Sequence, residues 1–422
     1  MNTAVVVITG SYPFPLLAED TFLQHEVRAL AGTFDSVHVV PLRAVGEQAG
    51  VPHGVKVDTS LSRMRGSVRR RAGAVVSACV TPGVLTNVTG KDRPPSDRRA
   101  LLRTAIAMSD ALLVRDWLRR FASADHASGR FRIAYSYWCG GTTLGGLLAR
   151  KAGDVSKVVT RVHGADLYPW RHSPPFLPFQ RAIVTQADRV FPISNDGARF
   201  LIDNYEIPAD RIKVSRLGVA DPGGVAEQSE DGVWRLASCS YLVPVKRVGL
   251  IARVVGRLAS LAPRMKIEWQ HLGGGPGEAE LLKTTERILP PNARFQYRGS
   301  VSNQEVVRAY LDQPNDLFIN LSESEGIPVA AMEAISAGIP VFALDVGGMR
   351  EIVTDKNGCL LAPTLGAEQI ADALLAHLSD KSGLRKRAIA ARAVWAERYD
   401  ANRNFQTFAG ELLKLCEQST VG

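Results

Sequence analysis

The clearest chemical signal in the sequence is a pair of glutamates, Glu325 and Glu333, in one short segment. An apolar run ends near Leu321, a polar loop follows, Pro328 suits the first turn of a helix, and Gly338 suits its C-terminal stop. Free N–H groups and the dipole at the start of a helix favour bound phosphate. Glu325 precedes this helix and Glu333 lies inside it, eight residues on, so a rise of about 1.5 Å per residue separates them by about 12 Å along the axis. That is roughly the span of a nucleotide-sugar diphosphate.

Carboxylates accept hydrogen bonds from paired hydroxyls, so one glutamate could hold a sugar and the other a ribose. The helix start between them, Ile327, Pro328 and Val329, would then hold the diphosphate. The competing interpretation is that Glu325 only stabilises a helix N-terminus and that Glu333 is a surface residue. Taken alone, the pair favours this second interpretation.

The elements that must position these residues follow an alternating pattern. Short β-branched runs alternate with helical patterns, which predicts parallel sheets covered on both faces. Predicted strands are residues 5–9, 37–42, 133–138, 158–163, 189–194 and 213–217, then 234–240, 266–272, 294–297, 316–321 and 340–344. Helices are predicted from Asp20 or Thr21 to Gly32 and over residues 248–258.

We therefore expect an α/β protein with two doubly wound, Rossmann-like domains, residues 1–217 and 233–398. Residues 218–232, rich in Gly, Pro, Ala, Glu and Asp, have the composition of a linker. Such domains facing a cleft bind ligands at the carboxyl ends of their strands. The last segment, residues 399–422, is expected to form a helix that packs back on the first domain.

Around the glutamates the segment reads Ser-Glu-Ser-Glu325-Gly-Ile-Pro-Val-Ala-Ala-Met-Glu333, and Gly347-Gly-Met-Arg-Glu351 follows it. This pattern resembles the donor-site signature of retaining glycosyltransferases with the GT-B fold, family 4. The resemblance covers nearly the whole chain. It includes the loops at residues 238–247, 271–277 and 297–301. It implies that Glu325 and Glu333 hold the donor.

The resemblance also implies roles for the other loops of the second domain. Lys246 corresponds to the family's phosphate-binding lysine and would stabilise the departing nucleotide. The family commonly has an arginine five residues earlier, where this chain has Tyr241, so Arg247 is the nearest candidate for a second cation. Arg298 and Gly299 would lie beside the nucleobase, with the glycine allowing close approach.

In the first domain, His163-Gly-Ala-Asp166 follows a predicted strand and is similar to the family's His-Gly-x-Asp site. The resemblance implies that His163 approaches the donor sugar near its reacting carbon. Gly10 and Ser11, after the first strand, resemble the loop that approaches the donor phosphate and the acceptor. The loop lacks the G-x-G-x-x-G spacing of a nicotinamide site.

The reaction that the resemblance implies is transfer of a sugar from a nucleoside-diphosphate donor to an acceptor hydroxyl, with retention of the anomeric configuration. His163, Lys246 and Glu325 are the expected catalytic residues. We expect no metal, because Lys246 and the helix start would together stabilise the departing diphosphate and the D-x-D motif of metal-dependent transferases is absent. No cofactor is expected. Enzymes that hydrolyse glycosides with retention use two carboxylates about 5 Å apart. Glu325 and Glu333 are expected to lie farther apart than this, so a front-face displacement is favoured over a covalent intermediate.

The composition limits the class of protein, the number of domains and the cellular compartment. The chain has 422 residues, of which 45% are hydrophobic and 22% charged, which excludes a disordered protein and suggests two to three domains. Its five cysteines show no C-x-x-C pair or zinc-like spacing, so a reducing cytoplasm fits best. The apolar run at the N-terminus stops at Gly10, too early for a signal peptide or a membrane span.

The net charge of +9 is concentrated between residues 60 and 135, a segment that contains fifteen Arg or Lys residues and only five Asp residues. Such a region attracts polyanions, which indicates peripheral contact with an anionic membrane, or it is simply a solvated basic surface. No aromatic interleaving typical of RNA-binding modules is present, so nucleic acid is not expected as a partner.

The sequence says less about the acceptor than about the donor site. The basic region favours a glycan or lipid-linked acceptor in bacterial cell-surface polysaccharide synthesis, on the cytoplasmic side of the membrane. A small soluble acceptor, as in natural-product glycosylation, is the first alternative. A sugar-nucleotide epimerase of the same fold and a non-catalytic nucleotide-sugar-binding subunit are the others.

Overall fold

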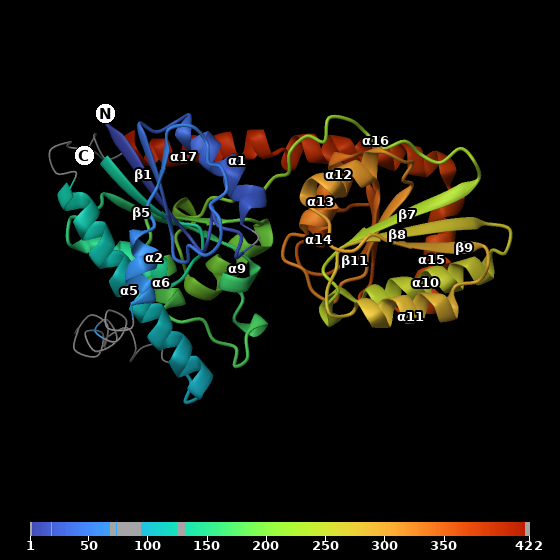
Figure 1. The fold of residues 1–422 in the computed structure, drawn as a ribbon, viewed down its shortest axis with the longest axis horizontal. Coiled ribbons are helices and arrows are strands. Elements are labelled where there is room, and N and C mark those ends of the chain that lie inside the picture. The colour runs from blue at the N-terminus through green and yellow to red at the C-terminus, as the bar shows by residue number, and fades with distance from the viewer. Residues whose placement is uncertain (1, 18, 68–72, 74–93, 125–130, 418–422) are drawn as a thin grey trace. The chain divides into compact units, whose positions relative to one another are not determined.

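The computed structural model describes the chain except residues 1, 18, 68–72, 74–93, 125–130 and 418–422, and Figure 1 shows its ribbon. The chain divides into two compact units. The first unit is Met1–Leu217 with Asn402–Gly422, and the second is Gly218–Ala401. Each unit contains a six-stranded sheet in which every strand pair is parallel, so the predicted α/β class with two doubly wound sheets is confirmed.

The first sheet has the strand order β3-β2-β1-β4-β5-β6. Its strands are β1 Thr3–Thr9, β2 Ser36–Pro41, β3 Val55–Val57, β4 Phe131–Ser136, β5 Lys157–Val162 and β6 Arg189–Pro192. Its helices are α1 Asp20–Ala31, α2 Ser60–Gly66, α5 Arg98–Ala124, α6 Gly141–Lys151, α7 Gly164–Leu167, α8 Gln180–Gln186, α9 Asn195–Tyr205 and α17 Ala401–Glu417. The chain winds outward in both directions from the neighbouring strands β1 and β4.

The second sheet repeats this arrangement, in the order β12-β11-β10-β7-β8-β9. Its strands are β7 Val233–Cys239, β8 Lys266–Leu272, β9 Ala293–Tyr297, β10 Leu317–Asn320, β11 Val341–Leu344 and β12 Gly358–Leu361. Its helices are α10 Val248–Leu261, α11 Glu278–Ile288, α12 Asn303–Leu311, α13 Val329–Ser336, α14 Met349–Ile352, α15 Ala367–Ser379 and α16 Lys381–Arg398. Figure 1 shows α10, α11 and α15 on one face of this sheet and α12, α13 and α16 on the other.

The prediction and the structure differ at three segments: two strands are not predicted, and one predicted strand does not form. β3 is missing from the prediction because it has only three residues, and β12 is missing because its four residues, Gly-Cys-Leu-Leu, include no β-branched residue. The strand predicted at residues 213–217 is wrong. That segment bonds to the strand β6 through Lys213 N and Ser215 N, but the carbonyl of Ser215 accepts from the Arg161 side chain (2.6 Å), and no regular ladder forms.

Residues 218–232, expected to form a linker, belong to the second unit. Ala226 N donates to Ala337 O (2.7 Å), and Ser229 N donates to the Asp316 carboxylate (2.9 Å). Val219 N donates to Tyr399 O, and Ala401 N donates to Val219 O, so the segment is paired with the chain that leaves the unit. A segment without apolar periodicity is therefore ordered by backbone hydrogen bonds.

The core of the first unit contains a buried ion pair. Arg161 of β5 donates to Glu26 of α1 at 2.7 Å, and both side chains are fully buried. The Tyr135 hydroxyl of β4 donates to the same carboxylate at 2.6 Å. The α17 helix packs on this group, since the Arg161 guanidinium lies 4.5 Å from the centre of the Phe408 ring. The C-terminal helix thus belongs to the first unit through specific contacts.

Replacing Glu26 by glutamine should destabilise the first unit strongly, because Arg161 would keep a buried charge without its counter-charge. Breaking one side of a buried pair costs about 3–5 kcal/mol. Urea unfolding followed by tryptophan fluorescence measures the change. As a control, Arg199→Gln removes an exposed partner of Asp196 in the same unit and should leave the midpoint unchanged. A wild-type midpoint for Glu26→Gln would contradict the prediction.

Candidate functional site

The carboxyl ends of β7 and β10 bring Lys246 and Glu325 together. These strands are neighbours in the second sheet, at the point where the winding direction reverses, and ligands of open α/β sheets bind at such points. Lys246 Nζ lies 2.8 Å from both carboxylate oxygens of Glu325. Asn320 at the end of β10 donates to the same carboxylate at 3.2 Å. Glu325 is buried, whereas the Lys246 side chain is 26% exposed and so is partly open to solvent.

Backbone contacts hold the loop that carries Glu325. Glu323 N donates to Val245 O (2.9 Å), which ties the loop after β10 to the 3₁₀ turn Pro244–Lys246 after β7. Gly347 has a φ of +52°, and a Cβ there would lie 2.0 Å from the carbonyl oxygen of Glu325. Only glycine allows this close approach, so the Gly347-Gly348 pair of the motif has a structural explanation.

The α13 helix begins directly after this loop. Val329 is its first residue, Pro328 precedes it, and among the described residues no side chain caps this end. Its first N–H groups lack intrahelical acceptors, as at every helix start. Gly338, with a φ of +72°, lies just past the helix end, as predicted for a C′ stop.

The two glutamates lie on either side of the start of α13, as predicted, and their spacing of about 12 Å stays a prediction. Glu325 lies in the loop before α13, and only the residues from Val329 onward are helical. Glu333 lies in the helix and is buried, so it is not the surface residue of the competing interpretation. Ile327 is buried beside the helix start.

Burial raises the pKa of Glu333 from 4.5 to about 7, and a hydrogen bond from the Asn303 side-chain amide partly opposes this rise. Asn303 is the first residue of α12, whose N-terminus is closed by a capping box between Ser302 and Glu305. The loop after β9 therefore ends at an amide that covers the second glutamate of the pair.

The other predicted donor residues occupy the loops after β8 and β9. Gly299 has a φ of +67°, and its carbonyl accepts from Gly273 N at 2.8 Å, so the two loops are joined. Arg298 is exposed, and its guanidinium donates to the Gln296 side chain (3.3 Å). Leu242 N donates to Gly274 O (2.8 Å), which connects the loop after β7 to the same group.

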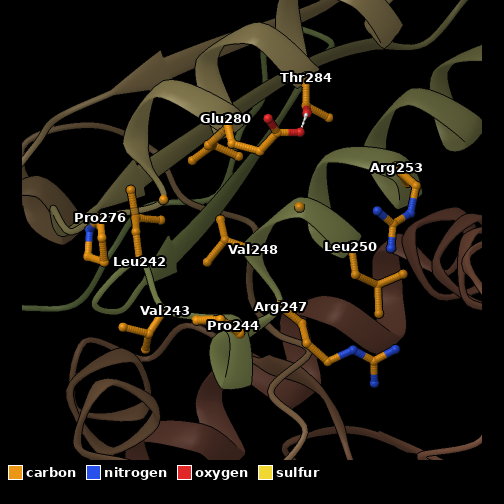
Figure 2. Close-up of a pocket in the computed structure, with 13 residues that line it drawn as sticks. Leu242, Val243, Pro244, Arg247, Val248, Leu250, Arg253, Pro276, Glu280 and Thr284 are labelled. Atoms are coloured by element: carbon orange, nitrogen blue, oxygen red, sulfur yellow. Dashed lines mark hydrogen bonds between the residues drawn. The ribbon is translucent and has the colours of Figure 1, made fainter.

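Arg247 adopts an unusual backbone conformation and lines a separate pocket. Its φ is +49°, in the left-handed region that non-glycine residues rarely adopt. The pocket has a volume of about 530 Å³, and Figure 2 shows Arg247 and Arg253 on one side of it and Glu280 and Thr284 on another. Lys246 is not among the described residues that line this pocket. A contact of Arg247 with the diphosphate therefore stays a prediction.

In the first unit, His163 follows β5 and lies in an aromatic setting. The centre of its ring is 4.4 Å from that of Trp138 and 4.8 Å from that of Tyr137. Its backbone N–H donates to Asp166 (2.5 Å), which also accepts from Cys139 N (2.8 Å). Both ring nitrogens are buried and lack a hydrogen-bond partner in the described part of the chain.

Gly10 and Ser11 are buried, and their backbone N–H groups donate to the Glu19 carboxylate at 2.9 and 2.6 Å. The backbone N–H groups of the loop predicted to approach the donor phosphate and the acceptor thus have a partner within the chain. Glu19 also accepts from the Trp138 indole.

Sequence reasoning did not identify four residues of these clusters as functional: Glu19, Trp138, Asn303 and Asn320. Asn320 ends a buried strand, and Asn303 follows a serine with a glutamate three residues on, so both carry a weak local signal. Glu19 and Trp138 carry no such signal, because 119 positions separate them.

Comparison with known proteins agrees with this architecture. Residues 226–394 match the family "Glycosyl transferases group 1", and residues 68–221 match "Glycosyltransferase Family 4". Two six-stranded parallel sheets with flanking helices are the architecture of the GT-B class of glycosyltransferase folds. The chain belongs to family 4 of the glycosyltransferases with the GT-B fold.

Among curated relatives, the D-inositol 3-phosphate glycosyltransferase of Nocardia farcinica is 27% identical over 55% of this chain and 55% of its own. The amylovoran biosynthesis glycosyltransferase AmsK of Erwinia amylovora is 28% identical over 59% and 62%. The putative colanic acid biosynthesis glycosyltransferase WcaL of Escherichia coli is 29% identical over 52% and 55%. The chain thus spans less than two thirds of the length of these relatives.

Two solved structures share the fold over nearly the whole chain. Anabaena Alr3699/HepE, in complex with UDP and glucose, has a TM-score of 0.64 at 18% identity and covers 96% of this chain and 98% of its own. The lipopolysaccharide outer core galactosyltransferase WaaB has a TM-score of 0.65 at 15% identity and covers 98% and 99%.

The pKa of Glu333 predicts a pH dependence of stability. The folded protein holds this proton up to about pH 7, whereas the unfolded chain releases it near pH 4.5, so stability falls as the pH rises through that window. Replacing Glu333 by glutamine removes this loss. The variant should gain stability over the wild type between pH 4.5 and pH 7, by at most about 3 kcal/mol.

Thermal unfolding of both proteins across this pH range measures the difference. Glu286→Gln, at an exposed position of α11, is the matched control and should differ from the wild type equally at every pH. If the gain of Glu333→Gln does not change with pH, Glu333 does not titrate as described.

Proposed function

We propose that this protein transfers a sugar from a nucleoside-diphosphate sugar to an acceptor hydroxyl, with retention of the anomeric configuration. The observation that carries the proposal is the Lys246–Glu325 pair beside the uncapped start of α13, with Glu333 buried in the same helix. A cation, free helix N–H groups and two carboxylates are the groups that a nucleotide sugar requires.

In this proposal the diphosphate binds at the start of α13 and near Lys246. The ammonium carries three N–H donors, and its contacts with Glu325 occupy two of them. The third can donate to a phosphate oxygen, and the positive charge stabilises the nucleotide as it leaves. The lysine and the helix start would together do this without a metal.

Glu325 holds the sugar rather than attacking it. Both of its oxygens contact Lys246, and one also accepts from Asn320, so this carboxylate is engaged and not a free nucleophile. This supports a front-face displacement in which the leaving phosphate takes the proton of the acceptor. His163, whose ring nitrogens lack partners among the described residues, acts on the donor sugar in this proposal.

Glu333 would bind the ribose. An ionised carboxylate accepts from both ribose hydroxyls, whereas the protonated form accepts less well. Because burial raises the pKa of Glu333 to about 7, donor binding should strengthen as the pH rises through 7. Asn303 must share the carboxylate with the ribose or move from it.

The relatives support an acceptor in polysaccharide synthesis, since two of them are named for amylovoran and colanic acid biosynthesis. We therefore propose a glycan or lipid-linked acceptor and a cytoplasmic location. A small soluble acceptor is the second candidate, because other relatives are named D-inositol 3-phosphate glycosyltransferases.

Replacing Lys246 by alanine, or Glu325 by glutamine, should lower kcat/KM for transfer by roughly 10²- to 10³-fold, because each change removes a group that stabilises the transition state. Acceptor-dependent release of nucleoside diphosphate measures transfer, and NMR of the product reports its anomeric configuration. Lys266→Ala, at an exposed lysine at the start of β8, is the control and should keep full activity.

Wild-type rates in both variants would refute the roles of Lys246 and Glu325. An inverted product would refute retention. Donor binding without turnover, over a panel of acceptors, would favour a non-catalytic binding subunit. Conversion of the donor to another nucleotide sugar without an acceptor would favour an epimerase.

Peripheral membrane contact is proposed through the start of α5. Leu101 and Leu102 are 50% and 61% exposed there, next to the exposed Arg98 and Arg99. Apolar and basic side chains at one surface suit an anionic lipid interface. Within the described residues, no helix has the length and apolar character needed to cross a bilayer. Residues 68–72, 74–93 and 125–130 of the basic region lie outside the described part.

Arg98→Gln combined with Arg99→Gln should reduce co-sedimentation with phosphatidylglycerol vesicles, and added salt should reduce it for the wild type, because exposed charges are screened. Arg199→Gln, at an exposed arginine of α9, is the control and should bind like the wild type. Equal recovery with neutral vesicles, or binding that ignores salt, would argue against this surface.

A further inference from the structure

Glu19 lies where the loops after β1 and β4 meet, at the reversal point of the first sheet. It immediately precedes α1, and only 2% of it is exposed. Its carboxylate accepts from three consecutive backbone N–H groups, those of Gly10 (2.9 Å), Ser11 (2.6 Å) and Tyr12 (2.8 Å). The indole N–H of Trp138, from the loop after β4, donates to it as well. One buried charge therefore holds two loops together.

The loop after β1 is built around this carboxylate. A Cβ on Gly10 would lie 2.8 Å from Glu19 Oε1 and 2.7 Å from Leu17 Cδ1, so a larger residue there would have to displace the carboxylate or the Leu17 side chain. Hydrogen bonds to an ionised acceptor are roughly twice as strong as neutral ones, and a buried carboxylate is costly unless its oxygens are partnered. These N–H groups are thus bound to the chain's own anion.

The Trp138 side chain connects Glu19 to His163. One edge of the indole donates to the carboxylate, and its ring packs against the imidazole with centroids 4.4 Å apart. The imidazole itself makes no hydrogen bond with any described residue, since Asp166 Oδ2 stays 3.6 Å from Nδ1. Ring packing against Trp138 and Tyr137 is therefore what orients the His163 side chain.

We propose that Glu19 is a positioning residue for His163. It fixes the Trp138 ring and, through the Gly10–Tyr12 N–H groups, the adjacent loop, so that the imidazole has one orientation before any substrate binds. The catalytic consequence rests on the function proposed above, in which His163 acts on the donor sugar. Misplacing a catalytic group by about 1 Å can cost roughly 10²-fold in rate. The nucleotide is assigned to the second unit, so its affinity should not depend on Glu19.

The first test is spectroscopic and needs no activity. In histidine-labelled full-length protein, the ring signals of His163 are assigned by their loss in His163→Gln. Glu19→Gln removes the charge and turns an amide group toward backbone N–H donors, so the His163 ring signals should shift. Asp188→Asn is the matched control, because that carboxylate accepts from Val158 N at the opposite edge of the sheet. It should leave the His163 signals unchanged.

The second test is kinetic. Glu19→Gln should lower kcat roughly 10- to 100-fold while the KM for the nucleotide sugar stays within about twofold. Trp138→Phe keeps a ring against His163 but loses the N–H donor, so it should show a smaller loss of kcat. Trp117→Phe loses an indole N–H bonded to Ser60, far from this loop in the sequence, and should keep the wild-type kcat.

Wild-type His163 signals in folded Glu19→Gln overturn the proposal, as does a wild-type kcat in both Glu19→Gln and Trp138→Phe. If Glu19→Gln does not fold, Glu19→Asp, which keeps the charge on a shorter side chain, carries the same NMR comparison. The two proposals can fail separately. Absence of transfer with shifted His163 signals refutes the proposed function alone, and transfer with unshifted signals refutes the positioning role alone.

Discussion

Parallel strands that wind outward from a central pair leave two loops side by side at one sheet edge, and the polar groups of these loops must find partners. In each unit of this protein a buried glutamate meets that need. Glu325 joins the loops after β7 and β10 by binding Lys246, and Glu19 joins the loops after β1 and β4 by accepting from backbone N–H groups and Trp138. A buried carboxylate is stable only with such partners, so each loop pair is held by charge.

The two glutamates differ in what their partners can still do. Lys246 is partly exposed and retains a donor, so the Lys246–Glu325 pair can accept a ligand without breaking. Glu19 is bound by backbone and indole donors that point inward, so it orders the loop rather than offering a surface. Glu333 is a third case, since burial against the single amide of Asn303 leaves it with a raised pKa.

Much of the fold was predictable, because periodicity is local. Each strand of five or more residues that pairs on both sides, such as β1 and β8, is predicted, whereas the short edge strands β3 and β12 are not. The helix at residues 329–336 and its stop at Gly338 were predicted because proline and glycine signal helix ends. The strand predicted at residues 213–217 is wrong, because the Ser215 carbonyl accepts from the side chain of Arg161, 54 positions away, instead of from a strand.

The class of fold and the family are readable from the sequence alone, as are the candidate residues Glu325, Glu333, Lys246 and His163, because these signals lie in short contiguous motifs. The partners of these residues become known only from the folded structure. Lys246 and Glu325 are 79 positions apart, and Glu19 and Trp138 are 119 apart. Ion pairs and hydrogen bonds act over about 3 Å, so a partner becomes visible only after the sheets bring distant loops together.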